Sequence, residues 1–288
     1  MRRKTTAVRI GNVVLSSEEP VLVQSMLNTS TREVDACVEQ AIRIIEAGGR
    51  LVRITAPGVK EAEMLGEIHR RLRERGYTTP ISADIHFVAE AASVAARYVE
   101  KVRINPGNFA DKRATFKKLT YTDEEYAAEL EILRQKFTEF LEVCRQYGTA
   151  VRIGTNHGSL SDRIMSRYGD TPAGMVEATM EYLRVCQACD FKDVVISLKS
   201  SDCRTMVDAV RLLVEKMEAE GMCYPLHLGV TEAGEGEDGR IRSAVGIGTL
   251  LNEGIGDTIR VSLTEEPEAE IPVACELARI CSEPEYLK

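Results

Sequence analysis

The sequence predicts an α/β fold, a single (β/α)8 TIM barrel, and three observations predict it. Short apolar runs rich in β-branched residues alternate eight times with segments of helical periodicity, and this alternation is typical of a parallel sheet covered by helices. The 288 residues suit such a barrel, which needs about 250. No linker rich in Gly, Ser or Pro divides the chain. A doubly wound open sheet is the alternative, but eight evenly repeated units favour closure.

The expected strands, in chain order, are VLVQSM (21–26), LVRITA (51–56), ISADI (81–85), KVRINP (101–106), AVRIGT (150–155), DVVISLK (193–199), PLHLGVT (225–231) and DTIRVSL (257–263). Amphipathic stretches between them predict helices, among them 34–47, 59–75, 175–188, 204–219 and 267–281. RIGNVVLSS (9–17) predicts a hairpin that closes the N-terminal end of the barrel. The expected division is therefore a hairpin segment over 1–20, the barrel over 21–283 and a tail over 284–288.

One connection is much longer than the others. Residues 109–148 form an insertion between the fourth strand and the fourth helix of the barrel, and TDEEYAAELEILRQKFTEFLEVCRQYG within it predicts a long, charged helix with a solvated face.

Composition narrows the class of protein. The chain is 44% hydrophobic and 28% charged, with a formal net charge of −8, which argues against nucleic acid as a partner. No apolar run has the length of a membrane span, and MRRKTTAVRIGNVV has no apolar signal region, so secretion is not expected. Eight scattered cysteines without a disulfide rhythm predict a reducing, cytoplasmic location.

Four expected strands carry an arginine at the same phase, namely Arg53, Arg103, Arg152 and Arg260. Side chains two apart share a face of a strand. The apolar neighbours can therefore face the helices, while one polar set faces the lumen near the carboxyl ends of the strands, where barrel enzymes keep their active sites. The other members of this set are Ser82, Asp84, His86, Asn105, Asn156, Ser197, Lys199, His227, Thr231 and Ser262.

A single strand arginine is commonly an ion pair with a carboxylate such as Asp84. Four arginines and Lys199 in one cavity, with essentially Asp84 and Glu232 as carboxylates, would repel one another strongly unless a ligand supplied negative charge. Arginine also matches phosphate oxygens bidentately. The pattern therefore predicts a phosphate or diphosphate ligand.

Three further motifs contain residue types that can carry chemistry. TEAGEGEDGR (231–240) predicts a mobile loop, and Glu232 at its start is a candidate acid or base beside the cationic cavity. CQAC (186–189) has no matching second pair, so packing is expected rather than metal binding. The GIG within SAVGIGTLL lacks the strand–glycine–helix context of a dinucleotide fingerprint.

Seven motifs follow one another along the chain: VQSM, ADIHF, RINPGN, RIGTNHGSL, SLKSSD, LHLGVTEAG and EGIGDTIRVSL. Together they resemble the barrel of the 4-hydroxy-3-methylbut-2-enyl diphosphate synthase family, over nearly the whole chain to about residue 268. The stretches NFADKRATFKKLTYTDEEY and GEGEDGR resemble the long form found in plants and some bacteria. Members of this family reductively open and dehydrate 2-C-methyl-D-erythritol 2,4-cyclodiphosphate on the methylerythritol phosphate route to isoprenoids.

The resemblance implies a role for each matching residue. The diphosphate would be held by Arg53, Arg103, Arg152, Lys199, Arg260 and Ser262. The rest of the pocket would be lined by Asp84, His86, Asn105 and Asn156. Glu232 would be the acid/base near the substrate carbons.

The resemblance also implies a cofactor that these residues do not match. The family holds a 4Fe-4S cluster with three cysteines and a glutamate in a separate C-terminal domain, and Cys275 and Cys281 are not in that motif. No cofactor or metal is therefore expected in this chain, which would bind substrate without turnover. Ferredoxin or flavodoxin would be the electron donor of the full-length enzyme. Two alternatives remain: a Schiff-base aldolase using Lys199, and a non-catalytic phosphate-binding barrel.

Overall fold

A computed structural model describes residues 2–111 and 120–282. Its main sheet is parallel and has the strand order β8-β7-β6-β5-β4-β3-β10-β9. A parallel bridge between Ile196 and Leu226 joins the two ends of this sheet, so the barrel is nearly closed. The strands are β3 (Leu22–Met26), β4 (Leu51–Thr55), β5 (Ile81–Asp84), β6 (Lys101–Ile104), β7 (Ala150–Asn156), β8 (Val194–Lys199), β9 (His227–Leu228) and β10 (Thr258–Ile259). The predicted barrel is confirmed.

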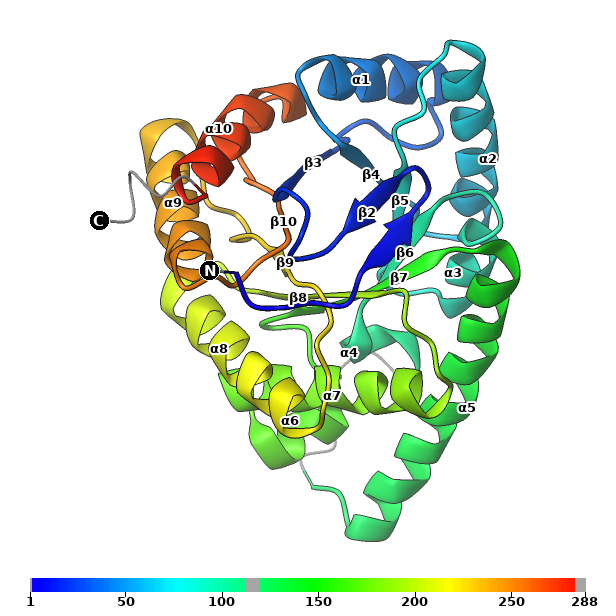
Figure 1. Cartoon of the computed structure of the whole chain (residues 1–288). Coiled ribbons are helices and arrows are strands. Elements are labelled where there is room, and N and C mark those ends of the chain that lie inside the picture. Colours follow the sequence, from blue (N-terminus) through cyan, green and yellow to red (C-terminus); the bar gives the residue numbers. More distant parts are fainter. Residues whose placement is uncertain (1, 112–119, 283–288) are drawn as a thin grey trace.

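Helices surround the strands, as Figure 1 shows. They are α1 (Val34–Glu46), α2 (Val59–Glu74), α3 (Ala89–Ala95), α4 (Pro106–Phe109), α5 (Asp123–Tyr147), α6 (Asp162–Tyr168), α7 (Pro172–Ala188), α8 (Cys203–Ala219), α9 (Gly236–Asn252) and α10 (Pro267–Ile280). In the described part of the chain, no helix is long and apolar enough to cross a membrane.

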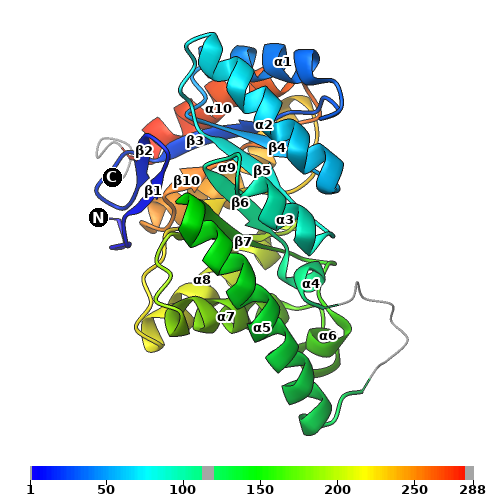
Figure 2. The same ribbon diagram turned by 90° about the vertical axis from the view of Figure 1, so that its right-hand side faces the viewer.

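The long helix α5 lies along the outside of the barrel (Figure 2). A capping box at Thr122 and Glu125 begins it, and Gly148 ends it in the left-handed conformation that glycine adopts without strain. The predicted insertion over 109–148 thus contains the expected charged helix, although part of it, 112–119, lies outside the described residues.

Two expectations about element length are wrong. Strands expected over 225–231 and 257–263 keep only two ladder residues each. The Leu226 N–H donates to the Asp257 carboxylate at 2.9 Å instead of to a strand partner, so the β9 ladder begins only at His227. The mobile loop expected over 231–240 is wrong in its second half, because α9 already begins at Gly236.

A hairpin closes the N-terminal end of the barrel (Figure 1). Strands β1 (Val8–Ile10) and β2 (Val13–Leu15) pair antiparallel, and Gly11 has a φ of +59° at the first position of their two-residue turn, where glycine is favoured. One face of the hairpin packs on lumen residues in a second apolar cluster, which consists of Val8, Ile10, Val13, Leu15, Leu22, Leu51, Ala150 and Val195. The hairpin thus covers the N-terminal end of the lumen, opposite the carboxyl ends of the strands.

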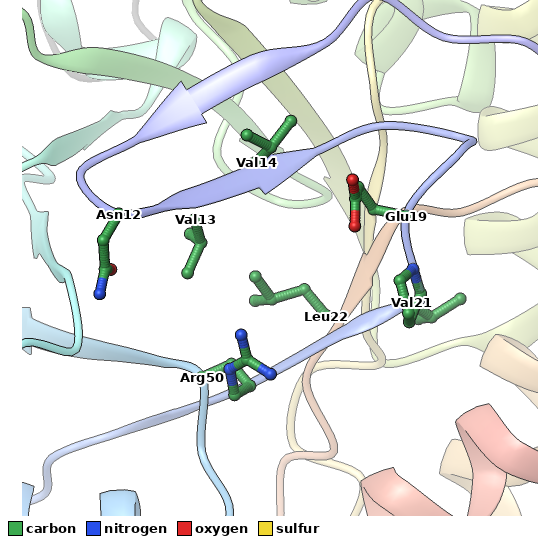
Figure 3. Close-up of a pocket in the computed structure, with 8 residues that line it drawn as sticks. Asn12, Val13, Val14, Glu19, Val21, Leu22 and Arg50 are labelled. Carbon is green, nitrogen blue, oxygen red and sulfur yellow. The ribbon is translucent and has the colours of Figure 1, made fainter.

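Beside the hairpin lies a surface pocket of about 400 Å³, lined by residues of β2, the segment after it and the start of β3 (Figure 3). Arg50 and Glu19 border it, together with Val13 and Leu22. This pocket is on the opposite end of the barrel from the carboxyl ends of the strands.

Strand residues that face the helices build the main core. Val52, Ile54, Val102, Ile104, Val151 and Ile153 are fully buried in it. Each such side chain contributes about 1.5–3 kcal/mol when buried. A register slip of one residue would exchange these apolar side chains with the arginines between them. The alternation therefore fixes which side chains the lumen receives.

Candidate functional site

Cations gather in the upper lumen of the barrel. In the described residues, six cationic side chains at lumen-facing strand positions lie within electrostatic reach of one another. They are Arg53 of β4, Lys101 and Arg103 of β6, Arg152 of β7, Lys199 of β8 and Arg260 just after β10. Five of them are at least 92% buried, and Arg260 lies at the rim with 14% of its side chain exposed. Such a cluster is costly without negative charge nearby.

Asp84 at the end of β5 supplies part of that charge. Its two carboxylate oxygens accept from Arg53 Nη2 at 2.8 Å and Arg103 Nη1 at 3.1 Å. Burial by itself would raise the pKa of Asp84, but the two guanidinium groups outweigh burial and hold this pKa well below its ordinary value. The carboxylate therefore stays ionised and orients two of the arginines.

His86 lies beside this pair. Its Nε2 is 3.3 Å from Asp84 Oδ2 and also contacts Arg103 Nη1. Burial, together with the charge of Arg103, lowers the pKa of His86 although Asp84 opposes the shift. The imidazole is therefore neutral near pH 7, and a neutral ring can accept a hydrogen bond from Arg103.

Two glycines make room for the cations. A Cβ at Gly154 would lie 2.4 Å from Arg103 Nε, and a Cβ at Gly229 would lie 2.9 Å from Lys199 Nζ. Arg103 Nη2 also donates to the Gly154 carbonyl at 2.7 Å. Both glycines thus hold open the paths along which Arg103 and Lys199 cross neighbouring strands.

Arg152 differs from the other arginines because it lacks partners. It is 1% exposed, and its Nε and Nη1 have no hydrogen-bond partner among the described residues. Burial, followed by the charges of Arg53 and Arg103, lowers the pKa of Arg152. An arginine nevertheless stays protonated. Buried donors without partners are rare in proteins, so these two nitrogens indicate a place for an acceptor.

Sequence reasoning named Asp84 and Glu232 as the carboxylates of the lumen and missed Glu270. Glu270, in the first turn of α10, accepts from Arg260 Nε and Nη2 at 3.1 Å each, and it is 1% exposed. Ser25 Oγ and the Leu263 amide also donate to it. Glu232 is exposed instead. No strand pattern could indicate Glu270, because a helix delivers it to the strand ends.

Lys101 is a lumen residue that sequence reasoning missed. It lies two positions before Arg103, so the same alternation contained the signal. Its side chain is fully buried, and Nζ donates to Gln24 Oε1 at 3.3 Å. Gln24 Nε2 is in turn 3.3 Å from His227 Nε2. Burial and the neighbouring cations Arg152 and Arg53 lower the pKa of Lys101 well below its ordinary value.

The other predicted residues lie at the mouth of the lumen. Asn105 caps α4: its Oδ1 accepts from the Gly107 N–H, and its Nδ2 donates to Ser159 Oγ. Asn156 Oδ1 lies 3.4 Å from Arg103 Nη2. Ser262, two residues beyond Arg260, is partly exposed. Asn156 and Ser262 are thus both partly exposed near the carboxyl ends of their strands.

Comparison with known proteins decides the family. Residues 5–275 match the model of the GcpE TIM-barrel domain. This chain belongs to the GcpE family. A relative from Parabacteroides distasonis, named 4-hydroxy-3-methylbut-2-en-1-yl diphosphate synthase (flavodoxin), is 64% identical over 276 residues, which cover 96% of this chain and 45% of the relative. A chloroplastic relative from Arabidopsis thaliana, named as the ferredoxin form, is 52% identical over 97% of this chain and 38% of its own length. The predicted family resemblance is confirmed.

Solved structures agree with this GcpE barrel in fold alone. A dihydropteroate synthase from Yersinia pestis has a TM-score of 0.59 at 13% identity, over 96% of this chain and 99% of that chain. A sialic acid synthetase from Leptospira borgpetersenii has a TM-score of 0.61 at 9% identity, over 99% of this chain and 93% of that chain.

The GcpE chain spans about 45% of the length of the first curated relatives it matches. Its eight cysteines all lie in the described residues and form no disulfide. Within residues 2–111 and 120–282, no three His, Cys, Asp or Glu side chains are grouped so that they could hold a metal ion. CQAC ends α7, with Cys186 buried and Cys189 at the cap. The described residues therefore do not fit an iron–sulfur cluster, and no cluster chemistry is assigned to them.

Proposed function

We propose that this chain is the substrate-binding barrel of a 4-hydroxy-3-methylbut-2-enyl diphosphate synthase and that its lumen binds 2-C-methyl-D-erythritol 2,4-cyclodiphosphate. The observation that carries the proposal is Arg152, a buried guanidinium group with two unpartnered nitrogens amid other cations. A diphosphate would supply both the negative charge and the acceptors that this cavity lacks.

The proposed division of labour follows from which partners each side chain already has. Arg152 and Lys199 form no ion pair in the described part of the chain, so they bind phosphate oxygens directly. Arg53 and Arg103 are oriented by Asp84, and Arg260 by Glu270. Each of these three arginines therefore uses, for the ligand, N–H groups that do not point to Asp84 or Glu270. Ser262, His86, Asn105 and Asn156 complete the pocket at its mouth.

We propose Glu232 as the residue that exchanges a proton with the substrate. It follows β9 on the loop before α9, is exposed, and has a φ of +52°, a conformation that non-glycine residues seldom adopt without a reason. In a full-length protein that carries this barrel, Glu232→Gln should lower kcat by roughly the 10²–10⁴-fold typical of a positioned acid/base. Near-normal turnover at saturating substrate would remove Glu232 from this role.

The activity of the whole enzyme extends beyond these residues. We propose an oxidoreductase that uses a 4Fe-4S cluster held outside this chain, with flavodoxin or ferredoxin as electron donor, since the relatives are named for these donors. Free cysteines throughout the barrel suit a reducing cytoplasm. The chain by itself would bind the cyclodiphosphate without turning it over.

Titration calorimetry of this chain with the cyclodiphosphate tests the proposal. Arg103→Ala removes one charge-assisted contact, which contributes roughly 1.5–3 kcal/mol, so the affinity should fall by about one to two powers of ten. Arg134→Ala is the matched control, because Arg134 is on the exposed side of α5 and, among the described residues, pairs with Glu131 three residues earlier. Binding unchanged in Arg103→Ala would place the ligand elsewhere.

The Schiff-base aldolase is a second candidate, favoured by one observation. Burial, followed by four neighbouring arginines, lowers the pKa of Lys199 well below its ordinary value, and a neutral amine is what imine formation requires. Borohydride would trap a carbonyl substrate on Lys199 if this candidate held. Absence of a mass increase at Lys199 with simple aldoses and keto acids would leave the diphosphate proposal alone.

A further inference from the structure

Beneath the arginines, three polar side chains form a chain across the lumen. Lys101 Nζ donates to Gln24 Oε1, and Gln24 Nε2 donates to His227 Nε2, each at 3.3 Å. The Gln24 oxygen faces Lys101 and accepts from it, and the Gln24 amide nitrogen, which can only donate, faces His227. His227 Nε2 is then an acceptor, and its proton is on Nδ1, which has no partner among the described residues. The imidazole is therefore neutral.

Charged and titratable side chains from six strands and from α10 surround this layer. They are Arg53 (β4), Asp84 (β5), Arg103 (β6), Arg152 (β7), Lys199 (β8), His227 (β9), Arg260 (after β10) and Glu270 (α10). Asp84 is engaged by Arg53 and Arg103, and Glu270 by Arg260. Neither carboxylate is paired with Lys101 or Lys199 in the described structure. Burial and the surrounding cations lower the pKa of both lysines well below the ordinary value.

A count of charge shows what the lysines add. With both amines neutral, the four arginines and two carboxylates leave two positive charges. Each phosphorus of a cyclic diphosphate bears one acidic proton, lost well below neutral pH, so this ligand brings two negative charges. A linear diphosphate monoester brings about three above its last pKa of about 6. The arginines thus match the cyclic form, and opening the ring adds a charge that they do not match.

We propose that Lys101 and Lys199 are a proton reserve of the substrate site: both amines are neutral in the empty barrel, and one takes up a proton from solvent when a linear diphosphate occupies the lumen. The step is a protonation of R–NH2 to R–NH3⁺, so no bond to the ligand forms or breaks. Gln24 positions the Lys101 amine. The reserve would let one cavity stabilise both the cyclic substrate and the ring-opened product. This inference rests on the proposed function, because it requires a diphosphate in the lumen.

The sign of the pH dependence follows. A bound trianion raises the pKa of a lysine above its value in the empty site, and between these two pKa values binding takes up protons. The affinity for a linear diphosphate should therefore fall as the pH rises through that interval. The affinity for the cyclic compound should depend on pH less.

Calorimetry in two buffers measures the uptake directly. Titrations of this chain at pH 8.0 in Tris and in HEPES, with the cyclodiphosphate and with 3-methylbut-2-enyl diphosphate, give the number of protons from the change in enthalpy with buffer ionisation enthalpy. We expect at least half a proton more for the linear ligand than for the cyclic one. Lys101→Met or Lys199→Met should lower this difference by at least half, and Lys216→Met, on the exposed face of α8, should not change it.

Other outcomes decide against the proposal. Equal proton uptake for both ligands would overturn it, and so would a difference that neither methionine variant reduces. Chloride-dependent affinity without proton uptake would mean that the lysines are permanently charged and neutralised by chloride, which also overturns it. Should one variant fail to fold, the other variant and the unmodified chain still decide. Absence of binding by either ligand would refute the proposed function itself, whereas binding without proton uptake refutes only the proton reserve.

Discussion

Arg163 and Arg152 are equally buried, at 1% exposure each, but their surroundings are opposite. Arg163 on α6 donates to Glu181 at 2.6 Å and to Asp111 at 3.1 Å, and its guanidinium group also lies 4.6 Å from the Tyr126 ring. Arg152 on β7 has no carboxylate partner, and two of its nitrogens have no hydrogen bond in the described residues. The Arg163 cluster joins α5, α6 and α7, whereas Arg152 has no side-chain partner in residues 2–111 and 120–282.

The difference separates structural from functional burial of charge. When a paired buried arginine is removed, its carboxylate partners remain buried without a compensating charge. Such an arginine therefore contributes to the stability of the fold. An unpaired buried arginine costs stability unless a ligand supplies the compensating negative charge, which is the role we propose for the diphosphate at Arg152. Stored electrostatic cost of this kind is typical of binding sites. Four predictions test the contrast, from the largest effect to the smallest.

Arg163→Ala should lower the free energy of unfolding by about 3–5 kcal/mol, because it leaves the buried carboxylates of Glu181 and Asp111 without the arginine that neutralises them. Urea unfolding followed by circular dichroism measures the change. Arg167→Ala is the control: Arg167 stacks on the same Tyr126 ring at 3.9 Å but is a third exposed and pairs with the exposed Asp123, so its loss should cost less than about 1 kcal/mol. Equal losses in the two variants would contradict the structural role of the cluster.

Arg152→Met should leave the free energy of unfolding unchanged or raise it, since it removes a buried charge that has no partner. The affinity for the cyclodiphosphate should fall by about one to two powers of ten, from the loss of one charge-assisted contact. Arg260→Met should behave differently and destabilise the fold, because it leaves the buried Glu270 without its arginine. If Arg152→Met instead unfolds the protein, Arg152 has a structural partner and the contrast fails.

Gly154→Ala should weaken cyclodiphosphate binding by about tenfold, which corresponds to about 1.4 kcal/mol. The new methyl group would lie 2.4 Å from Arg103 Nε, so the guanidinium group must leave its place beside Asp84. Gly248→Ala on α9 is a suitable control, since its Cβ would meet nothing closer than Leu277 Cδ1 at 3.5 Å. Full affinity in Gly154→Ala, measured by calorimetry, would show that the position of Arg103 is not needed.

Glu232→Gln should change cyclodiphosphate affinity in this chain by no more than about twofold. Glu232 is exposed on its loop, and a carboxylate facing a diphosphate contributes no attraction. The amide keeps the shape and removes the negative charge, so any change should be towards tighter binding. Loss of binding in this variant would make Glu232 a binding residue and would remove its proposed role in proton transfer.

The sequence by itself determined the barrel, because the period of its apolar residues can be read without knowing any contact. Val52 and Ile54 alternate with Arg53, and the same alternation recurs around Arg103 and Arg152. The two-residue alternation along a strand determines which face each side chain occupies. The position of the arginines in the lumen could therefore be predicted from their place in this alternation. Lys101 has the same phase and could have been found by the same reasoning.

Only the tertiary structure decided how the charges are paired. Glu270 reaches Arg260 from the first turn of α10, Asp84 is shared by Arg53 and Arg103, and Arg152 has no such partner. Phase places a side chain on a face but does not give the distance between side chains on different strands, and it does not apply to a helix residue at all. The apolar pattern likewise did not show that β9 and β10 keep only two ladder residues each. Periodicity is a local property of the chain, whereas the compensation of a buried charge is a property of the packed barrel.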